Sequence, residues 1–227
     1  MNAGFGRIIN VMKWTKRLLA VLLVGIFVST FSVHAVHAED SVMNQMVVVP
    51  TGNYDVKEAQ AMKDRIQRIP APILSALNAK GVKVILTNDI ITNLPELNDL
   101  KGVTPRGWES TGLTWDDVPG VSESDVVVRI GYSKKGKGHN SYNLEIHETM
   151  HAVDRFVFNT ISGSQAFHDI FNKEASINYK NDGYFSVYPE EYFAEAASMY
   201  VYNDNTREQL KKTTPLTYDF LNKHFNP

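Results

Sequence analysis

One helical motif constrains the fold of this chain more than any other feature of its sequence. Residues 144–156, LEIHETMHAVDRF, contain His147 and His151 four positions apart, with Glu148 directly after the first histidine. In an α-helix, positions i and i+4 lie one turn apart on the same face, so both imidazoles can reach one ion. Apolar residues flank the histidines, which indicates a helix with a buried face. The chain therefore needs a helix that packs on a core and presents both histidines together.

The H-E-x-x-H spacing predicts a zinc site with a built-in general base. Glu148 lies about 100° around the helix from His147, outside the ligand row but within reach of a water molecule at the metal. Two imidazole ligands and a neighbouring glutamate form the arrangement that metalloproteases use. We therefore expect His147 and His151 to bind one catalytic Zn²⁺. Glu148 would take a proton from water and pass it to the leaving amine.

A catalytic zinc needs a third protein ligand, and a carboxylate on a second helix is favoured. The metzincin pattern requires a glycine at 154 and a histidine at 157, but this chain has Asp154 and Val157 there. The segment PEEYFAEAAS supplies Glu190, Glu191 and Glu195, and the last two share a helical face. One of those two could bind the metal while the other supports a ligand imidazole, and their spacing does not decide which. Asp154 is a further candidate for that supporting role.

The N-terminus has the pattern of a secretory signal peptide. Four basic residues precede an apolar run at 18–28, and small residues follow it. The run is short for a membrane-spanning helix, which needs about 20 apolar residues. Cleavage after Ala38 fits best, with Ala35 as the second option. We therefore expect residues 1–38 to be a signal peptide, and the rest to be secreted and extracellular without stable membrane insertion.

Composition excludes several classes of function. After removal of the signal peptide the chain would carry 19 basic and 25 acidic residues, and it has no basic stripe, which argues against a nucleic-acid partner. The absence of cysteine excludes thiolate zinc sites and cysteine nucleophiles. It also excludes disulfides, so an exported protein of this kind must rely on its core or on a bound metal.

The order of the predicted elements indicates an α+β fold. We expect a small mixed sheet with an N-terminal helix, followed by a mainly helical C-terminal half that carries the zinc site. Strands are predicted from runs of β-branched residues at 45–50, 82–88 and 125–133. Residues 39–227 are expected to form a single metalloprotease domain, with a sheet-containing lobe over about 45–135 and a helical lobe over about 136–227.

Several separated motifs resemble one known family. TPRGWESTGLTWDDVPGV, VVVRIGYSKKGKGHNSYNLEIHE, HETMHAVD and YPEEYFAEAAS follow one another in the order found in the secreted Pro-Pro endopeptidases of Gram-positive bacteria. These zinc metalloproteases are related to the catalytic domain of anthrax lethal factor. The resemblance implies a zincin-like fold and a proline-rich protein or peptide as substrate. It also implies cleavage of Pro-Pro bonds in bacterial surface or extracellular proteins.

The resemblance also implies roles for individual residues. Glu191 corresponds to the third zinc ligand, and Tyr184, seven residues earlier, corresponds to a tyrosine that stabilises the oxyanion. Trp108, in RGW, corresponds to a tryptophan that lines the substrate cleft, and Glu190 to a glutamate that helps to hold the substrate. Proline rings pack well on indole faces, which fits the role of Trp108.

The sequence departs from the family pattern at two places. Residues 122–125, SESD, are polar where the family often has glycines, so preferences beside the cleaved bond do not carry over. The loop around INYKNDGY is slightly longer than in the family, so Tyr188 and Tyr192 stay alternatives to Tyr184.

Two competing functions follow from the same residues. The first is a lethal-factor-like protease that acts on host proteins, although the chain is short for the docking domains that this would need. The second is a catalytically inactive extracellular binding or adhesion module. A binding module has no use for a general base, so Glu148 favours an enzyme.

Overall fold

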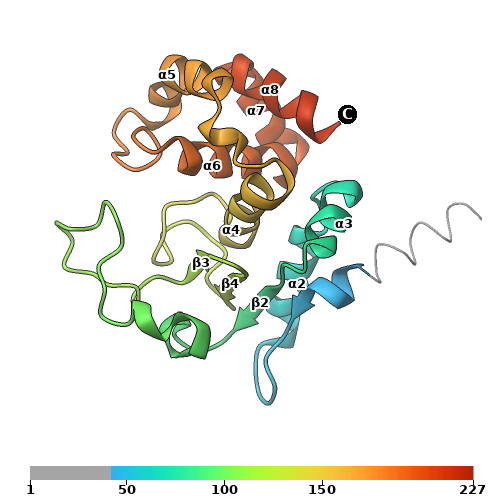
Figure 1. Ribbon diagram of the computed structural model, residues 1–227, viewed down its shortest axis with the longest axis vertical. Helices are drawn as coiled ribbons and strands as arrows, with labels where there is room; N and C mark the ends of the chain where they lie inside the picture. The colour runs from blue at the N-terminus through green and yellow to red at the C-terminus, as the bar shows by residue number, and fades with distance from the viewer. Residues whose placement is uncertain (1–41, 227) are drawn as a thin grey trace, which may run out of the picture. The chain divides into compact units, whose positions relative to one another are not determined.

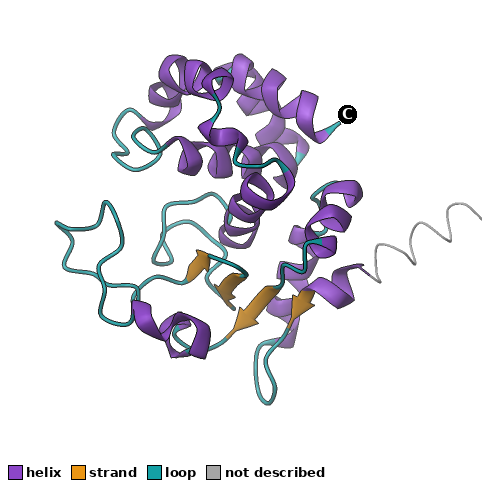
Figure 2. Cartoon of the chain, in the orientation of Figure 1, coloured by secondary structure: helices purple, strands orange, loops and turns teal. Residues whose placement is uncertain are grey.

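The computed structural model contains a four-stranded mixed sheet, which lies in the lower half of the view in Figures 1 and 2. Its strand order is β1-β2-β4-β3, with β1, β2 and β4 parallel and β3 antiparallel to β4. The strands are β1 (Val47–Val48), β2 (Val84–Thr87), β3 (Gly120–Ser122) and β4 (Val126–Arg129). The three valines of β4 are all buried, as expected for a strand covered on both faces.

The structure describes residues 42–226, and these belong to one compact unit. The predicted signal peptide, residues 1–38, lies outside the described residues. Within 42–226, no helix combines the length and the apolar character needed to cross a membrane.

Two helices connect the parallel strands β1 and β2, because parallel neighbours need a crossover rather than a tight turn. They are α2 (Val56–Ile66) and α3 (Ala71–Ala79). Asp55 caps α2 by accepting a 2.9 Å hydrogen bond from the amide of Glu58. Pro70 is the N-cap residue of α3, so it separates two helices and does not bend a single one.

The helix that carries the histidines, α4 (Leu144–Ala152), lies between the sheet and the helical second half (Figure 1). It contacts β3 and β4 of the sheet, as well as α2 and α6. Asn143 begins the helix by accepting a 3.1 Å hydrogen bond from the amide of Ile146. At its end the helix widens into a π-helical turn, Val153–Val157.

The second half of the chain is helical, as the sequence predicted. Its helices are α5 (Gln165–Tyr179), α6 (Pro189–Tyr202), α7 (Asp204–Thr213) and α8 (Pro215–Phe225). Every residue of α6 from Glu191 to Val201 is buried, so this helix forms the centre of the helical layer. The α+β class, the small mixed sheet and the helical C-terminal half are thus confirmed.

Residues 91–124 contain two kinds of element that the sequence did not indicate. Short 3-10 helices occupy Ile91–Asn93 and Pro95–Leu100, and β3 spans only three residues. A three-residue strand that begins at a glycine has no detectable periodicity, so pairing with β4 defines it rather than its own composition.

A buried ionic network fastens the start of α4 to α2. The carboxylate of Glu145, fully buried, accepts hydrogen bonds from Arg65 Nε and from Asn143 Nδ2 at 3.0 Å. The guanidinium of Arg65 also donates to Glu58 at 2.7 Å and to Ser133 at 2.9 Å. A buried carboxylate requires such a partner, because an unpaired charge in the interior is strongly destabilising.

Removing the cation from this network tests its importance. Arg65→Ala leaves the Glu145 carboxylate buried without its cation, so we expect the free energy of unfolding to fall by about 3–5 kcal/mol. Chemical denaturation of residues 39–227 measures this change. Lys212→Ala breaks the exposed Lys212–Glu208 pair and is the control, with an expected change of less than about 1 kcal/mol. An Arg65→Met/Glu145→Met variant should recover most of the loss, and an equal loss there would point to packing rather than charge.

Candidate active site

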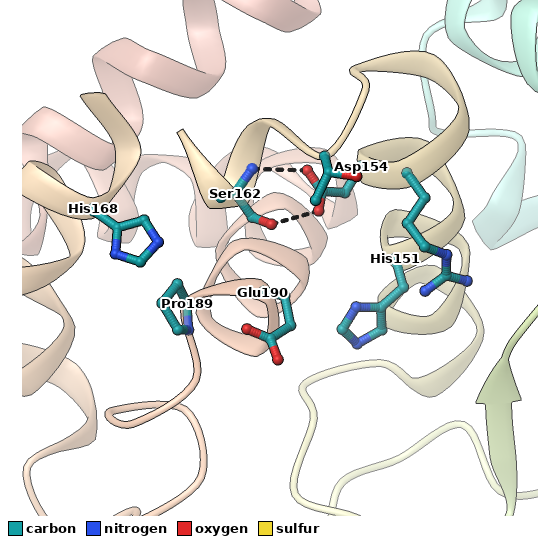
Figure 3. A pocket seen from close by; sticks show the side chains of 9 residues that line it. His151, Asp154, Ser162, His168, Pro189 and Glu190 are labelled. Atoms are coloured by element: carbon teal, nitrogen blue, oxygen red, sulfur yellow. Dashed lines mark hydrogen bonds between the residues drawn. The ribbon is translucent and has the colours of Figure 1, made fainter. Parts of the chain in front are cut away.

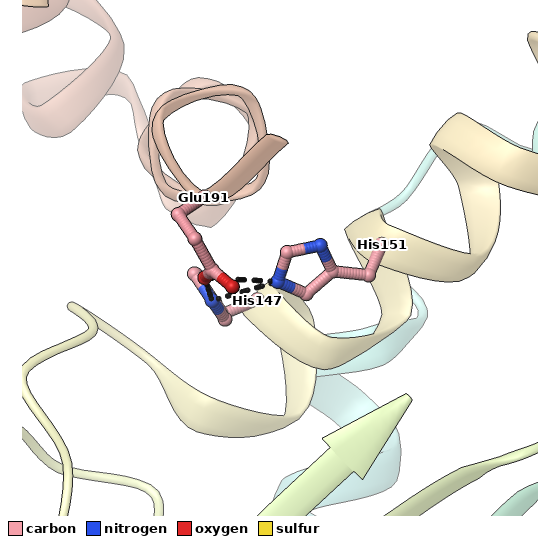
Figure 4. Close-up of side chains that lie close together, drawn as sticks. All are labelled: His147, His151 and Glu191. Carbon is pink, nitrogen blue, oxygen red and sulfur yellow. Dashed lines mark hydrogen bonds and ion pairs between the residues drawn. The ribbon is translucent and has the colours of Figure 1, made fainter. Parts of the chain in front are cut away.

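The two histidines of α4 and one glutamate of α6 converge on a single point (Figure 4). The Nε2 atoms of His147 and His151 lie 3.2 Å apart. Glu191 Oε2 lies 3.2 Å from the first of these nitrogens and 3.1 Å from the second. All three residues are buried, and their candidate ligand atoms lie within 4.8 Å of one another. His147, His151 and Glu191, from two separate helices, therefore form one cluster of potential metal ligands, called the donor cluster below.

Local sequence explains how α6 brings Glu191 to this point. Pro189 is the first residue of the helix, where its missing N–H leaves no hydrogen bond unmade. Glu191 consequently lies in the first turn, where the positive end of the helix dipole favours a carboxylate. The same turn faces α4, and the two helices are in direct contact.

The donor set fits a divalent transition metal. Two imidazole nitrogens and one carboxylate oxygen are a common set at catalytic zinc, and they leave one position open. Without a metal ion, protons on the imidazoles must balance the negative charge of the carboxylates. Burial lowers the pKa of His147, but the carboxylates of Glu191 and Glu195 outweigh this effect and raise the pKa to about 10. Burial acts to raise the pKa of Glu191, but His151 and His147 hold it well below its usual range. Metal binding here would therefore release a proton.

Glu195 lies behind His147, one turn beyond Glu191 on α6. Its Oε2 is 3.3 Å from His147 Nδ1, close but not aligned as a full hydrogen bond. The same carboxylate accepts from the backbone amide of Tyr142 at 2.9 and 3.2 Å. A carboxylate in this place can fix the imidazole's tautomer and orientation, which leaves Nε2 free to bind a metal.

Glu148 follows His147 on α4 and lines the same cleft as His147, His151 and Glu191. Its side chain is half-buried. Burial raises the pKa of Glu148, and the nearby imidazoles and Arg155 only partly oppose this effect. A carboxylate with a raised pKa, next to a metal-type donor set, is suited to accept and return a proton near neutral pH.

Tyr184 lies in the loop that precedes α6, next to the donor cluster. Its hydroxyl donates a 2.7 Å hydrogen bond to Glu191 Oε1. Asp182 fixes the turn by accepting from the amides of Tyr184 and Phe185 at 2.9 and 3.2 Å. Burial, reinforced by the Glu191 charge, raises the pKa of Tyr184 well above its usual range, so the phenol stays a proton donor.

The two alternative tyrosines lie elsewhere. Tyr192 is fully buried and its hydroxyl bonds to Thr217 at 2.7 Å, in the helical layer. Tyr188 packs edge-to-face on Tyr184 with ring centroids 5.3 Å apart, and its face supports Arg106. Of the three phenols, only that of Tyr184 hydrogen-bonds to a member of the donor cluster.

The donor cluster opens into a cleft of about 900 Å³. Trp108 and Trp115 both line this cleft and pack, half-buried, on a small apolar cluster. Glu190 lies at the rim, where it forms an ion pair with Arg106. The guanidinium of Arg106 also stacks on Tyr188 at 4.1 Å, so the loop that carries Trp108 is fastened to the start of α6.

Asp154 has hydrogen-bond partners outside the donor cluster. Its two carboxylate oxygens accept from the amide and hydroxyl of Ser162, at 2.9 and 2.5 Å. Figure 3 shows these bonds at the edge of a smaller hollow of about 300 Å³ beside His151. The π-helical turn at Val153 interrupts the regular helical row, and Asp154 holds the following turn. Support of the histidines by Asp154 stays a prediction.

Comparisons with known proteins agree with this architecture. The family described as anthrax toxin lethal factor, N- and C-terminal domain, matches residues 35–224. A Pro-Pro endopeptidase of Paenibacillus alvei is 61% identical, over 94% of this chain and 99% of that protein. A Pro-Pro endopeptidase of Clostridioides difficile (strain 630) is 45% identical, over 92% of this chain and 98% of that protein.

A solved structure has the same fold. The Pro-Pro endopeptidase PPEP-2 from Paenibacillus alvei matches with a TM-score of 0.79 and 65% sequence identity. The match covers 81% of this chain and all of the solved one. The fold and the matched family model place the chain in the class of lethal factor-type domains. Within that class, the chain belongs to the Pro-Pro endopeptidase family of peptidases.

Sequence reasoning missed several residues that shape the cleft. Arg106 belongs to the TPRGWESTG motif, but nothing in the sequence connects it with Glu190, which lies 84 residues later. Arg155 donates to the carbonyls of Ser122 and Glu123 at 2.7 and 2.9 Å, which fastens the β3–β4 turn to the end of α4. These contacts depend on how the two halves of the chain meet, which local patterns do not reveal.

A comparison of two carboxylates tests the role assigned to Glu195. Glu195→Gln removes the charge behind His147, so we expect zinc affinity to fall by about 10- to 100-fold. Competition with a chromogenic chelator measures the affinity. Asp154→Asn is the control, because its carboxylate bonds to Ser162; it should lower thermal stability but leave zinc affinity unchanged. Equal zinc affinities for the two variants would contradict the assignment.

Proposed function

We propose that this chain is a secreted zinc metalloendopeptidase that hydrolyses Pro-Pro bonds in proline-rich segments of bacterial surface or extracellular proteins. One observation carries the proposal: the His147, His151 and Glu191 donors converge at a cleft that also contains Glu148 and Tyr184. The name of both relatives, Pro-Pro endopeptidase, supports the choice of bond.

His147, His151 and Glu191 would hold one zinc ion, with Glu195 orienting the first imidazole. When bound, zinc supplies Lewis acidity toward the scissile carbonyl. The buried position of the donors keeps bulk water away and strengthens every charge interaction at this point.

Glu148 moves the proton. It takes a proton from the attacking water and delivers it to the nitrogen of the leaving proline. That nitrogen is a secondary ring amine and needs a proton before it departs. The raised pKa of Glu148 supports both transfers, because a carboxylate that is too acidic would hold the proton too weakly to deliver it.

Tyr184 stabilises the charge that develops on the carbonyl oxygen. In the structure its hydroxyl donates to Glu191, so it already points toward the donor cluster. Rotation of this O–H toward the substrate would place a hydrogen-bond donor at the oxyanion, where such donors are most effective.

Recognition of proline rests on Trp108 and on the loop that carries it. A rigid proline-rich segment loses little entropy on binding, and its rings pack on indole faces. Arg106 and Glu190, paired at the cleft rim, support the position of Trp108 next to the cluster.

Export is part of the proposal. The basic and apolar pattern of residues 1–38 supports a signal peptide cleaved after Ala38. Residues 39–227 would then be the active form, and N-terminal sequencing of the secreted protein tests this boundary.

Replacing the proposed base tests the mechanism. Glu148→Gln keeps the shape of the side chain but cannot accept the proton, so we expect full zinc content and at least a 100-fold loss of kcat, on the order of a general base's contribution. The assay follows cleavage of a Pro-Pro peptide by mass spectrometry, beside its Ala-Pro counterpart. Glu96→Gln, an exposed site, is the control. Full activity of Glu148→Gln would refute the mechanism, and a parent protein that binds zinc without cleavage would favour a binding module.

A pair of tyrosine variants tests the oxyanion donor. Tyr184→Phe removes the hydroxyl and keeps the ring, so we expect kcat to fall by about 100-fold or more with KM nearly unchanged. Tyr188→Phe is the matched control, because it keeps the ring on which Arg106 stacks and removes only the hydroxyl. Steady-state kinetics on the same peptide compares them, and a larger loss in Tyr188→Phe would reverse the assignment.

A further inference from the structure

Gly120, the first residue of β3, has little room for a side chain. A Cβ atom there would lie 3.0 Å from Leu144 Cδ1, 3.1 Å from Glu148 Cγ and 3.1 Å from Val128 Cγ1. These distances are shorter than normal van der Waals contact between carbon atoms. The strand backbone is therefore in direct contact with the stem of Glu148.

Backbone conformation does not explain this glycine. Gly120 is absent from the glycines with positive φ among the described residues, so an alanine could adopt its backbone angles. Space is the remaining reason, and glycine in a strand often marks the close approach of another group. Here that group is α4, which presents Leu144 and Glu148 from successive turns of one face.

The surroundings leave little freedom for the strand or the helix to move apart. Gly120 pairs with Val128 of β4, and Arg129 donates to the carbonyl of Pro119 at 2.8 Å. On the helix side, the Glu145 network and the buried Leu144 hold α4 in place. An added methyl group at position 120 would therefore push against Cγ of Glu148, as well as against the terminal methyl groups of Leu144 and Val128. Any shift of Cγ moves the Glu148 carboxylate that it carries.

We propose that Gly120 is a positioning residue for the Glu148 carboxylate. The missing side chain lets the Glu148 stem lie against β3, which sets the carboxylate relative to His147 and His151. This inference rests on the proposed function, because it matters only if Glu148 transfers the proton. It predicts that the loss in Gly120→Ala is in kcat, not in metal binding.

The test compares two alanine substitutions at glycines with ordinary backbone angles. Gly120→Ala should lower kcat for a Pro-Pro peptide by about 2- to 10-fold, because its neighbours must shift by a few tenths of an ångström and a misplacement of 1 Å can cost about 100-fold. Its KM and zinc content should match the parent. Gly163→Ala is the control, because a Cβ there would meet only Thr160 Cγ2, at 3.7 Å. An unchanged kcat for Gly120→Ala, or an equal loss in Gly163→Ala, would overturn the inference.

A second pair of variants keeps the test decisive if Gly120→Ala does not fold. Leu144→Ala removes the shortest of the three contacts but keeps the contact with Glu148. Gly120→Ala/Leu144→Ala should therefore fold like Leu144→Ala and show the same fall in kcat, about 2- to 10-fold, relative to it. Equal kcat values for these two variants would overturn the inference. Inactivity of the parent protein would instead refute the proposed function, so the two failures are distinguishable.

Discussion

The position of α4 between the sheet and α6 is the constraint on which the rest of the structure depends. One face of this short helix packs on β3 and β4, and another presents the histidines to α6. A helix of nine residues has little stability of its own, so it needs tertiary contacts on several sides. The Asn143 cap, the Arg65–Glu145 pair and the close contact with Gly120 together supply them.

The charges at the site are arranged by burial as much as by proximity. Burial favours the neutral form of each carboxylate, yet Glu191 stays ionised because two imidazoles surround it. Glu148, on the next position of the same helix as His147, lacks such close partners and has a raised pKa. The pKa values of two glutamates in one small region are thus shifted in opposite directions, because their environments differ.

Sequence periodicity predicted the helices and the longer strands because each has a local cause. Asn143, Ser164 and Pro189 begin their helices through caps or fixed backbone angles, and the valines of β4 are buried on a parallel strand. The spacing of His147 and His151 likewise required only helix geometry. By contrast, β3 and the Arg106–Glu190 pair exist only through contacts between distant segments. Asp154 lies in a π-helical turn and bonds to Ser162, a local departure from the regular helix that its spacing implies.

The two ion-pair partners Arg65 and Glu145 are 80 residues apart, whereas the donors His147 and Glu191 are only 44 apart. The cluster is therefore compact in sequence, but the support beneath it comes from the first half of the chain. The placement of the donors therefore depends on both halves of the chain. Residues 136–227 cut out alone would lack Arg65, the cation that pairs with the buried Glu145 carboxylate at the start of α4.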